Sequence, residues 1–565
     1  MYSFKALLLT AAVGGLAAGS ARADIKPHPL FTDNMVLQQG QRVTVWGKAD
    51  PGEKIGVVID GPTVLGIASP EVVTDGNGDW TVGLPAQSKA GTGNTLTIKG
   101  KNTVTLKNVA VGEVWVCSGQ SNMEWSVNAG ETPAKVKAEA KHPGIRLFTV
   151  QKRTAPAPIT DQADLGHFTK WVECGPETVG SFSAVAYHFG VKLEKELGVP
   201  VGLIHTSWGG TPAEAWASVE ALDADPALKH YADRARALAA QHAAAKASFD
   251  PAKAKAAYET AHAAWKEAAA KAKADGKPAP KEPAKPGTGP APLGPGTPGV
   301  LYNAMIHPLL KFRVKGAIWY QGESNAGRAF EYRTLFPAMI RDWRKRFDTE
   351  LPFCAVQLAP YRGGSSGVDY AELRDAQLSA TKTLPKVAIA VITDVGNENN
   401  IHPIPKQPVG ERLALAAAAV AYGKPVEGSG PAFKSVTFEG GGDKAVLSFD
   451  HVGGGLVAKD GELTGFALAG DDKVFHPAKA EIKGDMVVLT SDKVSKPVAA
   501  RYGWVNFAKP TLNFFNKAGL PASPFRTDDF PLTTDPKTVA PKKAEPKKVD
   551  PKAEPKKGEA KPDAK

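Results

Sequence analysis

The chain has 565 residues, a formal net charge of +11 and three cysteines, so it is too long for one domain and can bury several cores without disulfide bonds. Much of the positive charge is local, because residues 537–565 hold ten Lys against five Asp or Glu. The charge therefore does not indicate a nucleic-acid-binding protein, and we expect no nucleic-acid partner.

The first 23 residues have the pattern of an export signal. Lys5 gives a basic start, residues 6–19 are apolar or small, and Ala21-Arg22-Ala23 supplies the small-x-small pattern that a signal peptidase cuts. The apolar run is too short to span a bilayer comfortably. We expect residues 1–23 to be a removed signal peptide, with an N-terminal membrane anchor as the alternative. The mature protein is then exported, to the periplasm or the extracellular space.

The three cysteines leave at least one thiol unpaired in a monomer. Cys117 lies in an apolar segment and is predicted to be a buried core residue. A bridge between Cys174 and Cys354 is an open alternative that the sequence does not decide.

Residues 24–108 are predicted to form an N-terminal β domain. Short alternating segments at 43–47, 54–58 and 96–99 are separated by turns such as Asp50-Pro51-Gly52. Close strand spacing with Gly-rich turns favours a small sandwich.

Residues 109–424 alternate between predicted strands and helices. Apolar strands are expected at 111–116, 201–205, 314–320, 353–358 and 387–393, and helices at 184–197 and 409–422. Such a series predicts a parallel sheet covered by helices on both faces. Ligands bind beyond the carboxyl ends of the strands in these sheets, and polar clusters follow several of the strands here.

One segment interrupts this series. Residues 223–298 begin as an Ala/Lys-rich helical stretch and become a Pro/Gly/Lys tract after Gly276. We interpret the segment as an insertion, either a helical hairpin or a single long helix, followed by a flexible return.

Two further regions end the chain. Alternating apolar segments with Gly-rich turns predict a C-terminal β domain over residues 425–531. Residues 532–565 form a Lys/Pro/Glu-rich tail that cannot bury enough apolar surface to order itself, so disorder is expected. The simpler interpretation is that this tail is solvated and has no partner, and the alternative is that it contacts an anionic cell-envelope surface.

Ser121 is the candidate nucleophile. It follows the strand at 111–116 and sits between Gly119-Gln120 and Asn122. A strand-to-helix turn would expose the hydroxyl and point the next backbone amides at a bound carbonyl oxygen. Met123 stands where the Gly-x-Ser-x-Gly elbow of α/β-hydrolases has its second Gly, and a serine at a turn is more often structural.

The other strand ends make the pattern specific. Polar motifs occur in this order: Trp115-Val116-Cys117-Ser118-Gly119-Gln120-Ser121-Asn122-Met123, Ser207-Trp208-Gly209-Gly210-Thr211-Pro212, Trp319-Tyr320-Gln321-Gly322-Glu323-Ser324-Asn325 and Ile401-His402-Pro403. Together they resemble the sialate O-acetylesterase family, within the wider GDSL/SGNH hydrolases. The resemblance covers about residues 25–535 without the insertion. It implies an SGNH-type three-layer α/β/α domain with a parallel sheet, flanked by N- and C-terminal β-sandwich-like domains.

The resemblance also implies roles for residues. Ser121 matches the nucleophile and His402 the general base. The expected oxyanion donors are the amides of Ser121 and of Gly209 or Gly210, with a side-chain amide from Gln321 or Asn325, of which Gln321 is favoured. Residues expected to contact substrate are Gln120, Asn122, Glu323 and Trp208, although Glu323 fits a loop-holding role better than a reacting one.

The acid behind His402 departs from the family pattern. Relatives place an Asp three or two residues before the histidine, where this chain has Asn399 and Asn400. An Asn lacks the negative charge that stabilises an imidazolium. Asp394 is the expected triad acid and Glu398 the runner-up, and a dyad with a backbone carbonyl orienting His402 is left open.

The resulting hypothesis is a serine esterase that removes acetyl groups from carbohydrates such as sialic acid or plant or bacterial polysaccharides, through an acetyl-serine intermediate. A general short-chain carboxylesterase and a catalytically silent carbohydrate-binding protein are the alternatives. The sequence shows no metal-ligand spacing and no nucleotide-binding glycine pattern, so we expect no metal and no cofactor. It gives no prediction of oligomeric state.

Overall fold

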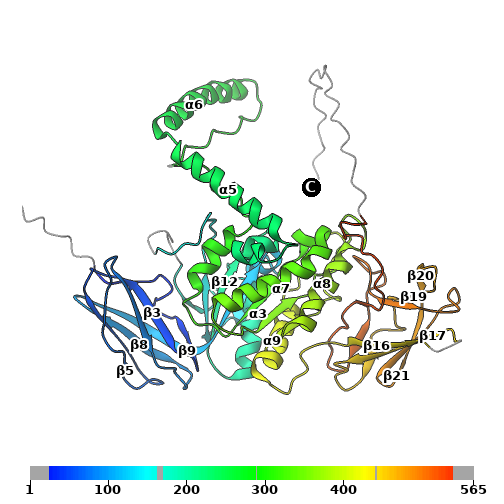
Figure 1. Cartoon of the computed structure of the whole chain (residues 1–565). Coiled ribbons are helices and arrows are strands. Elements are labelled where there is room, and N and C mark those ends of the chain that lie inside the picture. The colour runs from blue at the N-terminus through cyan, green and yellow to red at the C-terminus, as the bar shows by residue number, and fades with distance from the viewer. Residues whose placement is uncertain (1–23, 162–168, 288, 439–441, 539–565) are drawn as a thin grey trace, which may run out of the picture.

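The computed structural model describes residues 24–161, 169–287, 289–438 and 442–538. The expected signal peptide, and the expected tail from residue 539 onward, lie outside these ranges. A β region, a central α/β region and a second β region follow one another along the molecule, with the central region between the other two (Figure 1). Within the described ranges no helix is both long and apolar enough to cross a membrane.

The N-terminal β region forms around short, alternating strands. β1 (Lys26–Pro27), β3 (Val43–Lys48) and β7 (Asp79–Leu84) make one antiparallel sheet. β4 (Lys54–Asp60) pairs with β5 (Ile67–Ala68), β6 (Val72–Val73) and β8 (Gly91–Lys99). Along β4, buried Ile55, Val57 and Ile59 alternate with more exposed residues, as a half-buried strand requires.

One long strand joins this region to the next. β9 (Thr103–Gly119) pairs through its first half with β8 and with β2 (Val36–Gln38), and through its second half with the central sheet. The expected boundary at 108/109 therefore falls inside a continuous strand, at Asn108, whose φ is +54°.

The central sheet has the strand order β11-β10-β12-β9-β13-β14-β15. Its further members are β10 (His142–Thr149), β11 (Val172–Cys174), β12 (Val201–Ser207), β13 (Gly316–Tyr320), β14 (Phe353–Val356) and β15 (Val387–Ala390). The strands from β10 to β15 are parallel along this path. The sheet is nevertheless mixed rather than all parallel, because β11 and β8 pair antiparallel with its members.

Helices cover both faces of this sheet. On one face α3 (Ala184–Leu197) and α9 (Gln407–Tyr422) pack on Trp115, Cys117 and Ile318. On the other, α7 (Ala329–Arg346) and α8 (Asp369–Thr383) pack with Ala317, Trp319 and Phe353. Neighbouring residues of one strand thus enter different cores, as the two-residue period of a strand dictates. The helix expected at 184–197 is confirmed, and Gly198 ends it at φ +67°.

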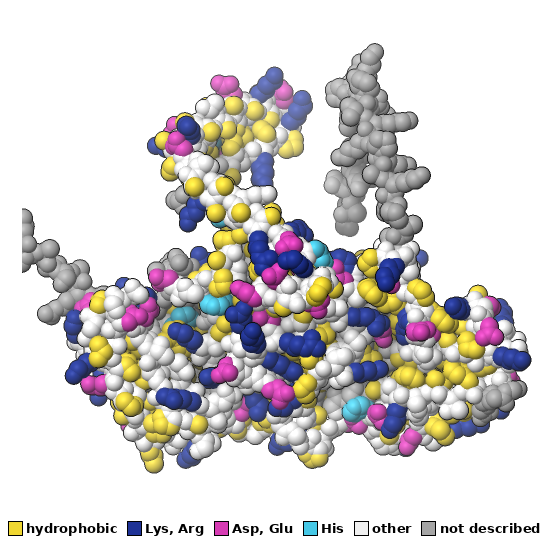
Figure 2. All heavy atoms as spheres, in the orientation of Figure 1, with side chains coloured by type: hydrophobic (Ala, Val, Ile, Leu, Met, Phe, Trp, Pro, Cys, Tyr) yellow, Lys and Arg dark blue, Asp and Glu magenta, His cyan; other side chains and the backbone are white. Residues whose placement is uncertain are grey.

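The insertion contains two helices, α5 (Lys229–Ala247) and α6 (Pro251–Ala274). We call residues 229–287 the arm. It stands away from the body of the molecule, with hydrophobic and Lys or Arg side chains on its surface (Figures 1 and 2). In α5 only Tyr231, Ala232 and Ala235 are buried, and in α6 no residue is. The Trp265 indole donates a hydrogen bond to the Pro280 carbonyl and so attaches the returning chain to α6.

The C-terminal β region has a core of its own. Its strands are β16 (Ala432–Phe438), β17 (Lys444–Asp450), β18 (Leu456–Ala458), β19 (Phe466–Ala469), β20 (Phe475–Pro477), β21 (Lys479–Lys483), β22 (Met486–Thr490), β23 (Ala499–Tyr502), β24 (Phe514–Asn516) and β25 (Phe525–Arg526). Leu447, Phe466 and Tyr502 lie in that core.

All three cysteines are buried free thiols, so the structure has no Cys174–Cys354 bridge. Cys117 is in the core as predicted, and burial raises its pKa well above the usual value for a thiol.

Candidate active site

The expected motifs meet at the carboxyl ends of neighbouring strands. β12, β9 and β13 are adjacent in the sheet, and Ser207, Ser121 and Gln321 stand at or just beyond their ends. Ser121 opens the short helix α1 (Ser121–Glu124) directly after β9. Parallel strands bring these segments together because they all end at the same edge of the sheet.

Gly119 makes the turn into α1 possible. Its φ is +140°, and a Cβ at this position would lie 2.2 Å from the Tyr320 carbonyl oxygen. The next amide, of Gln120, donates to that same oxygen at 3.0 Å. Only glycine allows so close an approach in this conformation.

Ser121 and His402 form a hydrogen-bonded pair. The Ser121 Oγ lies 2.8 Å from the His402 Nε2, although the two residues are 281 positions apart. His402 lies in the loop between β15 and α9, and its ring stacks on Trp125 with centroids 5.0 Å apart. Burial, and then the Lys406 ammonium, lower the pKa of His402. A neutral imidazole beside a hydroxyl can accept its proton.

The structure does not bring the expected acid to this pair. The Asp394 carboxylate is held by both terminal nitrogens of Arg412, at 2.6 and 2.7 Å. Glu398 pairs instead with Arg362 and Lys509. Among the residues described, no carboxylate contacts the His402 ring.

Asparagines shape the loop that carries the histidine. The Asn397 side chain accepts hydrogen bonds from the amides of Asn399 and Asn400 at 2.9 Å each. The Asn400 side chain in turn accepts from the His402 amide, also at 2.9 Å. Asn399 and Asn400 thus belong to the turn that presents His402.

Two groups of expected oxyanion donors have other partners. The Gly209 amide donates to the Glu124 carboxylate at 2.6 Å, and Lys152 binds the other oxygen of that carboxylate at 2.5 Å. Gln321 and Asn325 are buried and joined to each other at 2.6 Å. Gln321 also accepts from the Tyr332 hydroxyl, and Asn325 donates to Glu214.

The Ser121 amide and Gly210 are placed differently. The Met123 and Glu124 amides donate to the Gln120 carbonyl, whereas Ser121 is the first residue of α1, where an N–H has no acceptor within the helix. Gly210 is exposed, at φ +74°. A Cβ added to its neighbour Gly209 would lie 3.3 Å from the Ser121 Cβ, so this turn packs directly against the serine.

The residues expected to contact substrate mostly lie beneath the serine. Gln120 is buried and accepts hydrogen bonds from the amides of Gly322 and Ser324. Asn122 is fully buried and donates to Glu323. Trp208 is half-buried, and its ring lies 5.6 Å from the Lys152 ammonium.

A cavity of about 500 Å³ opens above the pair. Its walls include Ser121, His402, Trp125, Glu124, Lys152 and His205. Burial lowers the pKa of His205 to about 4, and its Nε2 lies 2.6 Å from the Ser207 Oγ. A pocket of this size can hold a small sugar with its acetyl group.

Sequence reasoning missed Glu124, Trp125, Lys152 and Lys406. Glu124 and Trp125 follow Ser121 by three and four residues, so the helical spacing after the serine was the signal available for them. Lys406 follows His402 by four residues but looks like a surface charge before a helix.

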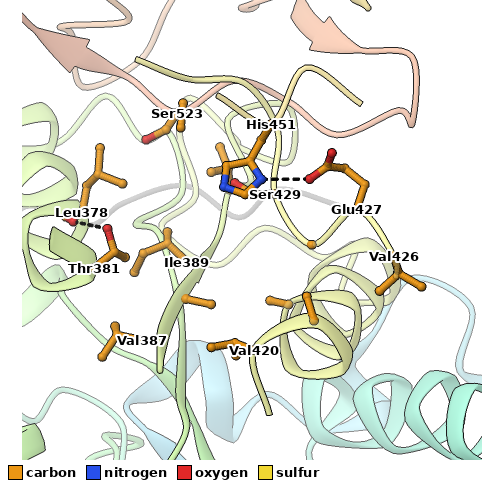
Figure 3. Close-up of a pocket in the computed structure, with 16 residues that line it drawn as sticks. Leu378, Thr381, Val387, Ile389, Val420, Val426, Glu427, Ser429, His451 and Ser523 are labelled. Carbon is orange, nitrogen blue, oxygen red and sulfur yellow. Dashed lines mark hydrogen bonds and ion pairs between the residues drawn. The ribbon is translucent and has the colours of Figure 1, made fainter. Parts of the chain in front are cut away.

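A second cavity, of about 380 Å³, lies between edge strand β15 and the C-terminal β region (Figure 3). Its walls are mainly apolar, and among its polar side chains the His451 Nδ1 lies 3.0 Å from the Glu427 carboxylate. It contains none of the expected site residues. Within the described ranges, no three His, Cys, Asp or Glu side chains are grouped so that they could hold a metal ion.

In this α/β fold, a serine that is hydrogen-bonded to a histidine lies at the carboxyl edge of the sheet. This is the arrangement of a serine hydrolase. Residues 287–419 match the family model described as carbohydrate esterase, sialic acid-specific acetylesterase. A carbohydrate acetylesterase from Xanthomonas citri is 36% identical, with a TM-score of 0.72, and the alignment covers 90% of this chain and 100% of that one. The chain belongs to this family of carbohydrate esterases.

Mammalian relatives agree with that assignment. Sialate O-acetylesterase from Homo sapiens is 27% identical over 88% of this chain and 91% of its own length. The enzyme from Rattus norvegicus is 28% identical over 88% of this chain and 93% of its own. The protein is therefore a sialate O-acetylesterase-like carbohydrate esterase.

Proposed function

We propose that this protein is an SGNH-type serine esterase that hydrolyses O-acetyl esters on carbohydrates, with Ser121 as nucleophile and His402 as general base. The observation that carries the proposal is the 2.8 Å hydrogen bond between the Ser121 Oγ and the His402 Nε2. The family assignment supports the substrate class, an acetylated carbohydrate.

The reaction proceeds in two displacements. His402 Nε2 takes the Ser121 proton as the Oγ attacks the acetyl carbonyl carbon, and the resulting imidazolium then protonates the sugar oxygen as the ester bond breaks. The sugar leaves as an alcohol and the acetyl group stays on Ser121. A water molecule, deprotonated by His402, attacks the acetyl-serine, and acetate leaves as the proton returns to the Ser121 oxygen.

The Ser121 amide at the start of α1 is the first oxyanion donor in this proposal, because its N–H has no helical acceptor. The second comes from the Gly209-Gly210 turn. Glu124 holds the Gly209 amide in the free protein, so either the substrate displaces that carboxylate or Gly210 donates. Gln321 and Asn325 hold the loop after β13 through the hydrogen bond between their side chains.

The proposed pair is a dyad. His402 has no carboxylate partner in the described chain, so the ring is oriented by its stacking on Trp125 and by the Asn397-based turn. Trp125 also lines the cavity and offers an aromatic face to a sugar ring.

Ser207 provides a matched control for the nucleophile, because it is a second serine of the same cavity that is bonded to a histidine. Ser121→Ala should lower the rate of acetate release by roughly 10³-fold or more, whereas Ser207→Ala should keep most of it. Acetate is measured from p-nitrophenyl acetate and from a panel of acetylated sialic acids and acetylated xylan. The same activity in Ser121→Ala and the wild type would refute the assignment.

A fluorophosphonate probe separates the alternatives for the whole site. Covalent labelling that is lost in Ser121→Ala supports the esterase, whereas the absence of labelling at Ser121 favours a catalytically silent carbohydrate-binding protein. Equal rates on acetyl and butyryl esters would favour a general short-chain esterase.

We also propose that residues 1–23 direct export to the periplasm or beyond, on the strength of their sequence pattern alone. The mass of the mature protein checks this, since cleavage after Ala23 leaves Asp24 as the first residue. A mature protein that begins at Met1 would contradict it.

A further inference from the structure

A buried polar cluster joins the two halves of the proposed dyad from below. Asn122, which is fully buried, is at its centre. Its side-chain nitrogen donates to Glu323 at 2.5 Å and to the Ile401 carbonyl at 3.0 Å. Its side-chain oxygen accepts from the Lys406 ammonium at 2.6 Å. Both donors and the acceptor of this amide are therefore engaged.

These contacts connect the segments that carry the reacting groups. Asn122 follows Ser121 in α1, Ile401 precedes His402, and Lys406 lies just before the first turn of α9. Glu323 begins the 3-10 helix η6 (Glu323–Arg328) after β13. A displacement of Asn122 would therefore move the serine relative to the histidine.

Lys406 is an unusual member of this cluster because it is a lysine with 3% of its surface exposed. Its ammonium lies 5.7 Å from the Trp125 ring and 5.6 Å from the Tyr320 ring. Lysine is almost never buried without a partner, since removing its charge from water is costly. Burial lowers its pKa to about 7, while the Glu323 carboxylate acts in the opposite direction.

We propose that Lys406 is a positioning residue of the esterase, whose buried ammonium holds Asn122 so that the Ser121 turn is fixed against the His402 loop, and whose charge acts on the His402 ring. The inference rests on the proposed function. It assigns Lys406 to the reaction through Asn122 and His402, not through contact with substrate.

The charge has a definite direction of effect. A cation disfavours the protonated histidine, so Lys406 adds to the lowering of the His402 pKa by burial. His402 then stays neutral to lower pH. The acid limb of the pH–rate profile, where activity falls as His402 is protonated, therefore shifts to lower pH. The other ionisable groups facing Lys406 are Glu323 and Tyr320, and burial raises the pKa of both.

The test compares pH profiles of kcat/KM for p-nitrophenyl acetate. In Lys406→Met the acid limb should rise by roughly half a pH unit, because the cation is gone, and kcat should fall about tenfold or more as Asn122 loses a partner. Lys406→Arg keeps the charge and should keep the acid limb near its wild-type position. Lys195→Met removes an exposed lysine from the last turn of α3 and should change neither quantity.

The outcomes separate this inference from the proposed function. A Lys406→Met enzyme with the wild-type rate and acid limb overturns the inference, and so does one that is slow with an unshifted limb, because that is what loss of structure alone would give. If Lys406→Met does not fold, as judged by circular dichroism, Lys406→Gln repeats the measurement with a side chain that still offers Asn122 a donor. Ser121→Ala, run alongside, decides the nucleophile independently.

Discussion

The Asp394 carboxylate has a structural partner that accounts for its position. Arg412 binds both of its oxygens and also donates to the Val391 carbonyl at 3.0 Å, so the pair fastens the end of β15 to α9. Both side chains are largely buried, with 21% and 13% of their surface exposed. A bidentate pair in such surroundings stabilises the fold through its geometry.

We expect Asp394→Asn to behave as a stability variant. It should lower the free energy of unfolding by about 2 kcal/mol, because it leaves Arg412 without its counter-charge, and should keep more than about a tenth of wild-type kcat. Chemical denaturation and rates measured well below the midpoint of thermal unfolding check this. A loss near 10⁴-fold in a fully stable variant would instead make Asp394 the triad acid.

From the sequence, the hydrogen-bonded pair of Ser121 and His402 could be predicted better than the residues around it. Ser121 and His402 lie in motifs whose spacing reflects strand ends, and strand ends can be recognised locally. The surroundings of Lys406 cannot, because its neighbours come from two distant parts of the chain, α1 on one side and β13 with η6 on the other. The partner of Asp394 was missed for the same reason, since Arg412 lies 18 residues further on, in a helix whose orientation the sequence does not reveal.

At the scale of elements, the turn between β9 and α1 depends on a single glycine. Gly119→Ala would place a methyl group 2.2 Å from the Tyr320 carbonyl oxygen at a φ of +140°. The backbone of β9 or β13 must then shift. We expect a loss of about 2 kcal/mol or more of stability and a large loss of kcat, because Ser121 moves.

Gly327 provides the comparison for that variant, since nothing lies within 4 Å of a Cβ added there. Gly327→Ala should leave stability within about 0.5 kcal/mol of wild type. Equal unfolding midpoints for the two alanine variants would show that the turn after β9 is not under the constraint described.

Periodic elements were predicted well and boundaries less well. The apolar spacing of 184–197 matches α3, and the apolar run of 201–205 lies within β12. The strand expected at 111–116 is only part of β9, which begins at Thr103 and ends at Gly119. Lys107 and Asn108 lie within this strand. The Lys107 backbone amide donates a hydrogen bond to the Asp33 carboxylate, and the Asn108 side chain donates to Asn34 and Glu173.

At the scale of the whole molecule, the arm contributes little to the packed core. Replacing residues 238–285 by a flexible Gly/Ser linker of about 15 residues keeps the buried base of α5. This deletion should leave the midpoint of thermal unfolding within a few degrees of wild type, since α6 has no buried residue.

The hydrolysis rates of the deletion variant on small and on polymeric substrates then test the function of the arm. We expect an unchanged rate on p-nitrophenyl acetate, because the cavity residues come from other segments. A reduced rate only on acetylated polysaccharide would assign the arm to long substrates, whereas a reduced rate on both would contradict its independence from the active site.

β9 has a consequence for how such a protein can be recombined. The strand pairs with N-terminal strands along its first half and with central strands along its second half, and it runs without a break to the residue before Gln120. A chimaera of two relatives joined at residue 108 would divide one continuous strand between the two parents. The smallest segment that can be exchanged intact therefore includes the whole of β9 and its neighbours β2 and β8, so the N-terminal β region is inherited together with the strand that presents the serine.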